Sequence, residues 1–338
     1  MKIGIVGDVH WSKYSSIVRM RGEKYSYRLE NCIKSINWAE EITKDCDRVV
    51  YLGDFFDSSE LNSEELTALK EIKWNDVPHA FLVGNHELGL NDLSFSSAHL
   101  FNFKGGNPAI DKPSYSCYGN TEIYYLPYIV NNSGNIEDYL SKPVDGYKRI
   151  IFSHNDIAGI QMGKYVSKSG FTIESIEANC DLFINGHLHS GGWVTNKILN
   201  IGNLTGQNFG EDASIYQHNI FILDTDTLEL SSYENPFALN FYKIDSTRQL
   251  WDSTKLKQNA VLTLKCEEKS QEYHREWLLN APNIVAFRLI IISTSVSAKG
   301  VPINEIITVN HLDKFKEYIL ENLGHTEIVV QELAEVLK

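Results

Sequence analysis

The sequence predicts an α/β fold in which a sandwich of two β-sheets is flanked by helices. A small α+β domain and a helical C-terminal segment would follow. Three observations lead to this prediction. The first 189 residues contain five short apolar runs of the kind that form strands buried on both faces, and helix-like stretches lie between the first three of them. Short strand-like stretches with turn residues occupy positions 190–234 and would complete a second sheet. A separate strand–helix–strand pattern begins after Pro236.

Each of the five predicted strands ends at a cluster of glycine, aspartate, asparagine or histidine residues. These segments are 2–10, 48–57, 79–87, 149–156 and 181–189. Sites in α/β proteins lie beyond the carboxyl ends of strands. We therefore expect the five clusters to meet at one edge of the fold.

Two amphipathic stretches between the first three strands predict helices. The stretch 27–44 places Leu29, Ile33 and Ile36 at helical spacing, and the stretch 62–74 opens with Ser63 as a candidate N-cap. The alternation of strand and helix predicts a mostly parallel sheet with right-handed crossovers.

The chain divides into three parts at changes of pattern. Residues 1–235 carry the five clusters, and residues 236–296 contain predicted strands 260–268 and 284–293 around a helix at 270–280. After a linker at 296–302, residues 303–338 predict two short amphipathic helices separated by Gly324.

Composition limits the class of protein. The chain has 338 residues, a net charge of −13, and five dispersed cysteines without a CxxC spacing. Scattered cysteines favour a reducing compartment, and neither a signal peptide nor a membrane-spanning stretch is predicted, so we expect a soluble, cytoplasmic protein. Acidity disfavours nonspecific binding to nucleic acid, so a polyanionic substrate would require a metal site, a basic patch or a partner.

The strand-end clusters bring together oxygen and imidazole groups that suit divalent metals, including manganese. They are Asp8, His10, Asp54, Asp57, Asn85, His86, His154, His187 and His189. This set is too large for one ion, and two ions that share a bridging carboxylate would use it. The alternative is that these groups pair with one another without metal, but burying so many polar groups at one edge without a cation would be costly.

The same motifs, in this order, resemble the calcineurin-like metallophosphoesterases. They are Asp-x-His, Gly-Asp-x-x-Asp, Gly-Asn-His-Glu, a lone histidine after a strand, and Gly-His-x-His. Within that superfamily the chain resembles the SbcD-type (MRE-type) subunits of DNA double-strand-break repair nucleases, including phage versions. The resemblance covers residues 1–235 and extends more loosely to 236–296, where that family carries a DNA-capping domain. One departure is Glu87, because aspartate is more usual at that place.

The resemblance implies a metallophosphoesterase fold and a role for each matching residue. It implies that one ion is held by Asp8, His10 and His189, and the other by Asn85, His154 and His187. Asp54 would bridge the two ions, which would be Mn²⁺ or alternatively Mg²⁺. Asp57 would orient a ligand imidazole. His86 would contact the scissile phosphate without being a ligand.

A basic loop follows the first motif and is a candidate DNA contact. Within residues 11–28 its cations are Lys13, Arg19, Arg21, Lys24 and Arg28, and tyrosines lie between them. Cations can neutralise phosphates and aromatic rings can stack on bases. The alternative is a solvated basic loop with no ligand.

The resemblance also implies an activity and partners. The expected protein is a manganese-dependent 3′-to-5′ exonuclease on duplex ends and an endonuclease on single-stranded or hairpin DNA, acting in DNA repair and recombination. It would form a homodimer and dock an SMC-like, SbcC-type ATPase on residues 303–338. The alternatives are a phosphatase or cyclic-nucleotide phosphodiesterase with the same two-metal core, and a non-catalytic scaffold on this fold.

Overall fold

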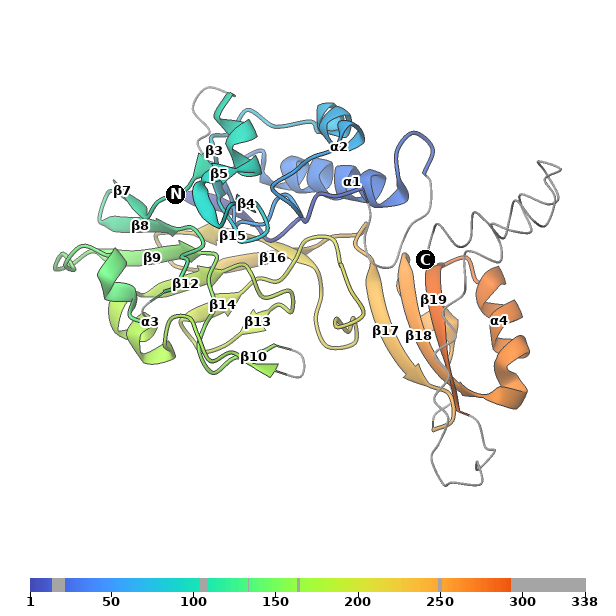
Figure 1. The fold of residues 1–338 in the computed structure, drawn as a ribbon. Helices are drawn as coiled ribbons and strands as arrows, with labels where there is room; N and C mark the ends of the chain where they lie inside the picture. The colour runs from blue at the N-terminus through green and yellow to red at the C-terminus, as the bar shows by residue number, and fades with distance from the viewer. Residues whose placement is uncertain (14–21, 104–108, 133, 163–164, 249–250, 293–338) are drawn as a thin grey trace. The chain divides into compact units, whose positions relative to one another are not determined.

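The structure is a computed structural model that describes residues 1–13, 22–103, 109–132, 134–162, 165–248 and 251–292. The chain forms two compact units (Figure 1). The first contains residues 1–242 and 257–260, and the second contains residues 243–256 and the described residues from 261 onward. The predicted C-terminal helices at 303–338 lie outside the described residues.

The first unit contains a six-stranded sheet with the order β16-β15-β1-β2-β3-β6. Its strands are β1 (Lys2–Val6), β2 (Arg48–Tyr51), β3 (His79–Leu82), β6 (Ala109–Ile110), β15 (Asn219–Asp224) and β16 (Leu230–Glu234). Strands β1, β2, β3 and β6 run parallel, whereas β15 and β16 are antiparallel to their neighbours.

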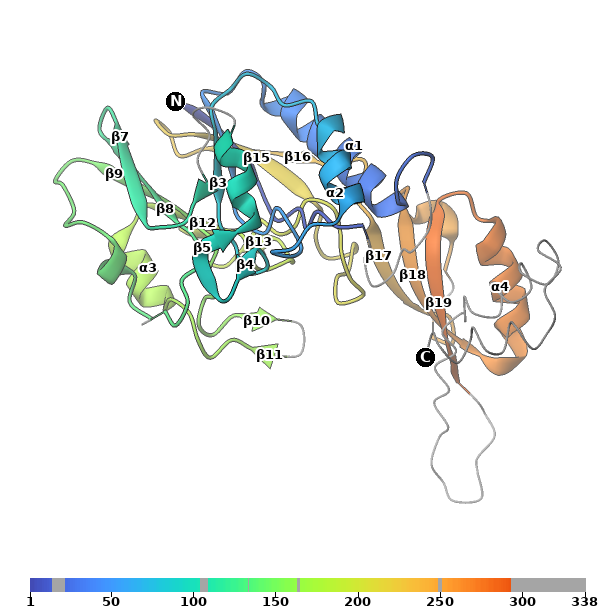
Figure 2. The same cartoon turned by 45° about the horizontal axis from the view of Figure 1, so that its top comes forward.

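A second six-stranded sheet has the order β13-β14-β12-β9-β8-β7. Its strands are β7 (Ser114–Tyr118), β8 (Thr121–Leu126), β9 (Lys148–Ser153), β12 (Leu182–Asn185), β13 (Gly192–Trp193) and β14 (Ile198–Asn200). The predicted two-sheet α/β sandwich is therefore confirmed, with three of the five predicted strands in one sheet and two in the other. The smaller strands β4 (Leu88–Gly89), β5 (Asp92–Ser96), β10 (Gln161–Met162) and β11 (Tyr165–Val166) form two separate hairpins (Figure 2).

One expectation about the second sheet was only partly correct. The β13–β14 hairpin joins it, but the β15–β16 hairpin extends the first sheet. The reason is that β15 pairs with the open edge of β1, where Ile5 lies opposite Phe221. This pairing buries Leu223 in the core between the sheets.

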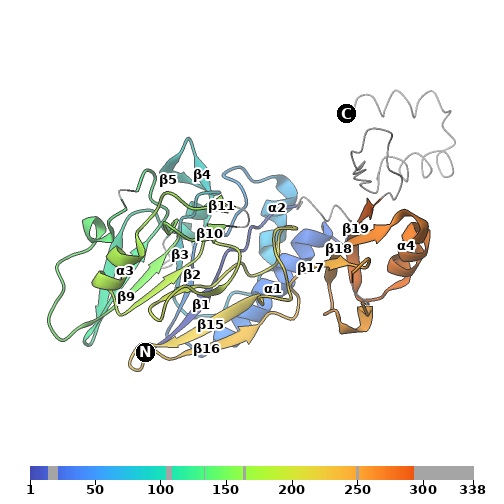
Figure 3. The same cartoon turned by 90° about the horizontal axis from the view of Figure 1, so that it is seen from below.

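Three clusters of apolar side chains stabilise the first unit: one lies between the sheets, and one lies on the outer face of each sheet. Between the sheets, Ile5 and Val50 meet Phe152 and Ile184. Helix α1 (Tyr27–Thr43) contacts β1 on the outer side of the first sheet (Figure 3). Helix α2 (Ser63–Ala68) lies beside α1, and α3 (Ile173–Asn179) packs on the outer face of the second sheet.

Helix α2 is shorter than the sequence predicts and has a different cap. It ends at Ala68 and continues as a 3₁₀ turn to Glu71. Asn62, not Ser63, is the N-cap, because its side chain accepts hydrogen bonds from the N–H groups of Glu64 and Glu65. The carboxylate of Glu65 accepts in return from Asn62 N, which completes a capping box.

The second unit contains the strand–helix–strand pattern expected after Pro236. It comprises β18 (Ala260–Glu267), α4 (Gln271–Asn280) and β19 (Ile284–Ile292). An additional strand, β17 (Asn240–Asp245), completes a sheet with the order β17-β18-β19, and α4 packs against β19. No helix among the described residues is long and apolar enough to span a membrane.

Candidate metal centre

The loops that follow β1, β2, β3, β9 and β12 carry all the predicted metal ligands. Parallel pairing aligns the carboxyl ends of β1, β2 and β3 in one sheet and of β9 and β12 in the other. Hydrogen bonds to Asp8 link the two sheets there, because Leu204 N donates to its backbone O at 2.8 Å and His187 N donates to its side-chain Oδ1 at 3.1 Å. The two sheets therefore contribute to one cluster.

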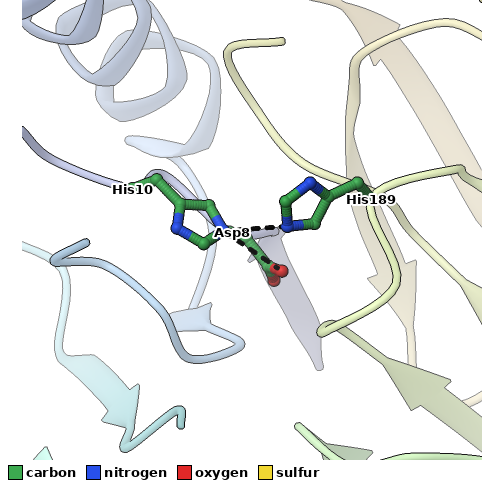
Figure 4. Close-up of side chains that lie close together, drawn as sticks. All are labelled: Asp8, His10 and His189. Atoms are coloured by element: carbon green, nitrogen blue, oxygen red, sulfur yellow. Dashed lines mark hydrogen bonds and ion pairs between the residues drawn. The ribbon is translucent and has the colours of Figure 1, made fainter. Parts of the chain in front are cut away.

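The first group of possible ligand atoms comes from Asp8, His10 and His189 (Figure 4), and these atoms lie within 4.8 Å of one another. The Nε2 atoms of His10 and His189 face each other at 3.0 Å, and His10 Nε2 lies 4.0 Å from Asp8 Oδ2. Among the described residues, Asp8 Oδ2 is buried without a hydrogen-bond partner. A buried carboxylate oxygen facing two imidazole nitrogens is the donor set of a divalent cation, so these residues fit one.

The second group consists of Asp54, His154 and His187, again within 4.8 Å. Asn85 Oδ1 joins it, at 3.2 Å from His154 Nε2 and 2.9 Å from His187 Nδ1. Asp54 Oδ2 lies 3.2 Å from His154 Nε2 and 3.9 Å from His10 Nε2. Because Asp54 faces both groups, it is placed where a bridging carboxylate would be needed.

The far nitrogen of each of these imidazoles has a protein partner. His10 Nδ1 donates to Asp57 Oδ1 at 2.9 Å, and His154 Nδ1 donates to Leu52 O at 2.6 Å. His187 Nε2 lies 3.2 Å from Asp156 Oδ1. Partners on the far side orient an imidazole and direct its other nitrogen toward a metal.

His189 has a comparable partner, since its Nδ1 lies 3.6 Å from Glu211 Oε1. Sequence reasoning did not identify Asp156 or Glu211 as part of the site. The available signals were their positions, because Asp156 follows His154 by two residues and Glu211 follows the Gly-His-x-His motif along the chain.

Buried carboxylates make the cluster attractive to cations. Although burial by itself lowers the pKa of His154, Asp54 and Asp8 raise it to about 9. Burial likewise favours neutral Asp54, but His154 and His10 hold its pKa below the usual range. The carboxylates thus draw a proton onto the His154 imidazole, and a divalent cation would satisfy the same negative charge.

Three of the predicted ligand residues have strained backbone conformations. His10, Asp54 and His187 have φ of 49°, 45° and 68°, in the left-handed region that residues other than glycine seldom adopt. Such strain is typical of functional sites that the surrounding structure holds in place. No local sequence pattern predicted it.

Close packing around the ligands requires glycine at two positions. A Cβ atom on Gly84 would lie 2.1 Å from Asp54 Oδ1, and one on Gly53 would lie 2.4 Å from His154 Nδ1. Glycine therefore allows these loops to approach the ligands.

Glu87, the departure from the usual motif, ties two of the loops together. It is fully buried and accepts hydrogen bonds from Gly84 N at 2.8 Å and Phe56 N at 3.0 Å. Burial and the nearby charge of Asp54 raise its pKa to about 8. The side chain of Glu87 thus connects the Gly-Asn-His-Glu motif to the Gly-Asp-x-x-Asp motif.

His86 lies at the open side of the cluster. Its side chain is 42% exposed, and its ring centre is 4.7 Å from that of His10. A hydrogen bond to Asp57 raises the pKa of His86 to about 9, and its backbone N–H donates to Asp54 Oδ1 at 2.9 Å. His86 is thus a cationic group that a ligand at the cluster can reach.

The prediction that Arg28 contacts DNA was wrong. Arg28 is fully buried at the start of α1, and its guanidinium donates to the carbonyls of Val9, His10 and Gly206 at 2.9–3.2 Å. It is needed there because these carbonyls belong to loops that lack regular pairing, and it supports the strained backbone of His10.

The other cations of the basic loop have different surroundings. Lys13 Nζ lies 2.8 Å from Glu64 Oε2, and the exposed Lys24 Nζ lies 2.5 Å from Glu71 Oε1. Arg19 and Arg21 lie outside the described residues. The described part of this loop therefore contains cations that are paired with acids.

Four histidines outside the motifs have protein partners that are not among the predicted metal ligands. They are His79 with Glu40, His99 with Asp111, His218 with the Asn203 carbonyl, and His274 with Ser246. These contacts agree with a structural role.

Comparison with known proteins identifies the class. Residues 1–191 match the family model described as calcineurin-like phosphoesterase. Because the match covers more than half of the chain, the chain belongs to this family, whose members bind two divalent metal ions. It is a metal-dependent phosphoester hydrolase by family and by its cluster of metal-binding groups.

Three solved structures illustrate what the chain is similar to. One is an archaeal phosphodiesterase, with 17% identity, a TM-score of 0.36, and coverage of 69% of this chain and 99% of that one. Another is a protein from Thermus thermophilus, with 10% identity, a TM-score of 0.39, and coverage of 69% of this chain and 98% of that one. A third is a dimetal phosphatase from Danio rerio, with 14% identity, a TM-score of 0.39, and coverage of 70% of this chain and 99% of that one. No curated protein matches the chain.

The packing at Gly84 leads to a first prediction. Gly84→Ala should displace the Asp54 carboxylate and abolish the stabilisation that Mn²⁺ confers on the wild-type protein. Saturating Mn²⁺ should raise the wild-type melting temperature by several degrees. Differential scanning calorimetry with Mn²⁺ and with chelator would measure both.

Gly119→Ala is the matched control, because a Cβ there meets no described atom within 4 Å. Its positive φ costs some stability, but its response to Mn²⁺ should equal that of wild type. An unchanged Mn²⁺ response in Gly84→Ala would contradict the placement of Asp54 between the two groups.

The buried position of Arg28 leads to a second prediction. Arg28→Met should lower the free energy of unfolding by on the order of 3 kcal/mol, because it removes the donor to the buried Gly206 carbonyl and one of two donors to each of the Val9 and His10 carbonyls. Urea unfolding followed by circular dichroism would measure the loss. Lys24→Met is the control and should change stability little, since Lys24 is exposed. Equal effects of the two substitutions would argue against a structural role for Arg28.

Proposed function

We propose that this protein is an SbcD-type, manganese-dependent DNA nuclease. It would act as a 3′-to-5′ exonuclease on duplex ends and as an endonuclease on single-stranded or hairpin DNA, in DNA repair and recombination. Membership of the phosphoesterase family and the converging donor groups support the hydrolase chemistry. The choice of DNA as the substrate depends on the second compact unit.

One ion would be held by Asp8, His10 and His189, the other by Asn85, His154 and His187, with Asp54 between them. Bound Mn²⁺, or alternatively Mg²⁺, supplies Lewis-acid stabilisation of phosphate charge and lowers the pKa of water. Because four imidazoles and an amide contribute no negative charge, two carboxylates leave the loaded centre positive. That local charge would attract a phosphodiester to a chain of net charge −13.

Asp57 and His86 would contribute the remaining chemistry. Asp57 holds the proton on His10 Nδ1 and so keeps His10 Nε2 directed into the cluster. His86, accessible and hydrogen-bonded to Asp57, would contact the scissile phosphate and help protonate the leaving 3′ oxygen.

The observation that carries the choice of DNA is the second compact unit. The family match ends at residue 191, yet the chain continues into a separate sheet covered by α4. An enzyme that acts on a small phosphate ester needs no such unit. Along the chain, the second unit occupies the position of the DNA-capping domain in the SbcD-type proteins. We infer that it contacts the polymer beyond the scissile bond.

A phosphatase or cyclic-nucleotide phosphodiesterase is the second candidate, and one observation favours it. In the described part of the basic loop, Lys13 and Lys24 are paired with acids and Arg28 is buried. That loop consequently offers less support for binding DNA than the sequence suggested. Activity on small esters without activity on DNA would identify this alternative.

A nuclease gel tests the proposed function. Purified protein with Mn²⁺ should degrade duplex ends and cut single-stranded or hairpin DNA, and a chelator should abolish both activities. His86→Ala should reduce turnover by about 100-fold or more while retaining the thermal shift with Mn²⁺, because His86 acts on substrate rather than on metal. His99→Ala is the control, since His99 pairs with Asp111 away from the cluster. Absence of cleavage by wild type under every metal condition would refute the nuclease proposal.

We further propose that residues 303–338 dock an SMC-like, SbcC-type ATPase and that the protein acts as a homodimer in the cytoplasm. Apolar residues at helical spacing in this segment, including Leu312, Phe315 and Ile319, support a docking surface. Deleting 303–338 should abolish co-purification with the ATPase and spare Mn²⁺-dependent cleavage. Loss of folding on deletion, seen by circular dichroism, would indicate that the segment packs on its own domain instead.

A further inference from the structure

A groove lies at the side of the sandwich, between the edges of the two sheets. It has a volume of about 380 Å³. One wall comes from β13 and β14 of the second sheet, including Trp193 and Leu199. The opposite wall comes from β15 and β16 of the first sheet, including Phe221, and the segment 213–217 completes the lining.

Strand register places this groove near the carboxyl end of β1, on the side of the fold where the metal cluster lies. Gly191 and Gly192 line it and follow His189 closely along the chain. On the other wall, Phe221 lies opposite Ile5, so Asn219 lies toward the end of β1 that leads to Asp8. The groove therefore adjoins the side of the cluster that carries Asp8 and His189.

The chemistry of the groove differs from that of the cluster. None of the described residues that line it is charged, although the chain as a whole is strongly acidic. Trp193 is 55% exposed on an edge strand and Ile215 is 81% exposed, so both present apolar surface to solvent. Gln217 and Asn219 add amide groups that can donate and accept hydrogen bonds.

We propose that this groove binds a nucleobase of the substrate, with Trp193 as the stacking platform. The inference rests on the proposed function, because it assumes that a nucleotide phosphate occupies the metal cluster. A neutral, flat ring with polar edges matches an uncharged groove that combines an exposed indole with amide groups. A phosphate would find no cation among the described lining residues, so the groove suits the base rather than the backbone.

Two small ligands isolate the contribution of the base. They are thymidine 5′-monophosphate and 2-deoxyribose 5-phosphate, which shares the sugar and phosphate but lacks the base. Isothermal titration calorimetry on the full chain with Mn²⁺ would give both affinities. The wild-type protein should bind the thymidine compound more tightly. If either compound is hydrolysed, the ratio of their KM values serves as the same measure.

Trp193→Ala should lower the affinity ratio of the two ligands about tenfold, because stacking on an aromatic ring is lost. Affinity for 2-deoxyribose 5-phosphate should stay constant. Trp193→Phe should retain most of the ratio. Tyr115→Ala is the matched control, since Tyr115 is 56% exposed on β7, the opposite edge strand of the same sheet, and should leave the ratio unchanged.

An equal affinity of wild type for the two ligands, or a ratio unchanged by Trp193→Ala, would overturn the proposal and leave the groove as a surface for another occupant. The nuclease gel fails or succeeds independently. A base preference that depends on Trp193 without cleavage of DNA would retain the groove and remove the nuclease function. Cleavage of DNA without such a preference would support the nuclease function and overturn the proposal for the groove.

Discussion

The buried pairing of carboxylates with imidazoles at the strand ends is the constraint on which the rest of this structure depends. Asp8 and Asp54 are almost completely removed from solvent, and so are His10 and His154. Charge in such surroundings is costly unless an opposite charge lies close by. A proton on His154 or divalent cations can provide that charge, and the geometry of the donor atoms favours the cations.

The architecture serves to hold these groups together. Two sheets with a common apolar core present their strand ends side by side, and loops from both sheets meet there. The loops are strained at His10, Asp54 and His187. They are held by buried polar side chains that connect one loop to another, among them Arg28, Glu87 and Glu211. The strain therefore persists because the surrounding contacts determine the loop conformations more strongly than local preference does.

The distribution of charge separates two kinds of surface on an acidic protein. With metal bound, the cluster would be a local positive site, while the groove beside it is uncharged in its described lining. A substrate with an anionic phosphate joined to a neutral ring would match both at once. With metal bound, this pattern would let a chain of net charge −13 attract an anionic phosphate locally.

Much of the fold and of the ligand cluster could be predicted from the sequence alone, because each ligand directly follows an apolar run that ends in a tight turn. The chain order of these runs and motifs was sufficient to predict the two-sheet α/β sandwich and the convergence of the ligand side chains. Tertiary structure alone decided which sheet receives the β15–β16 hairpin, since that depends on the open edge of β1. It also decided that Arg28 points inward and that Asp156 and Glu211 contact two of the predicted ligand histidines. These features arise from contacts between segments distant in the chain, and local patterns of residues contain no record of such contacts.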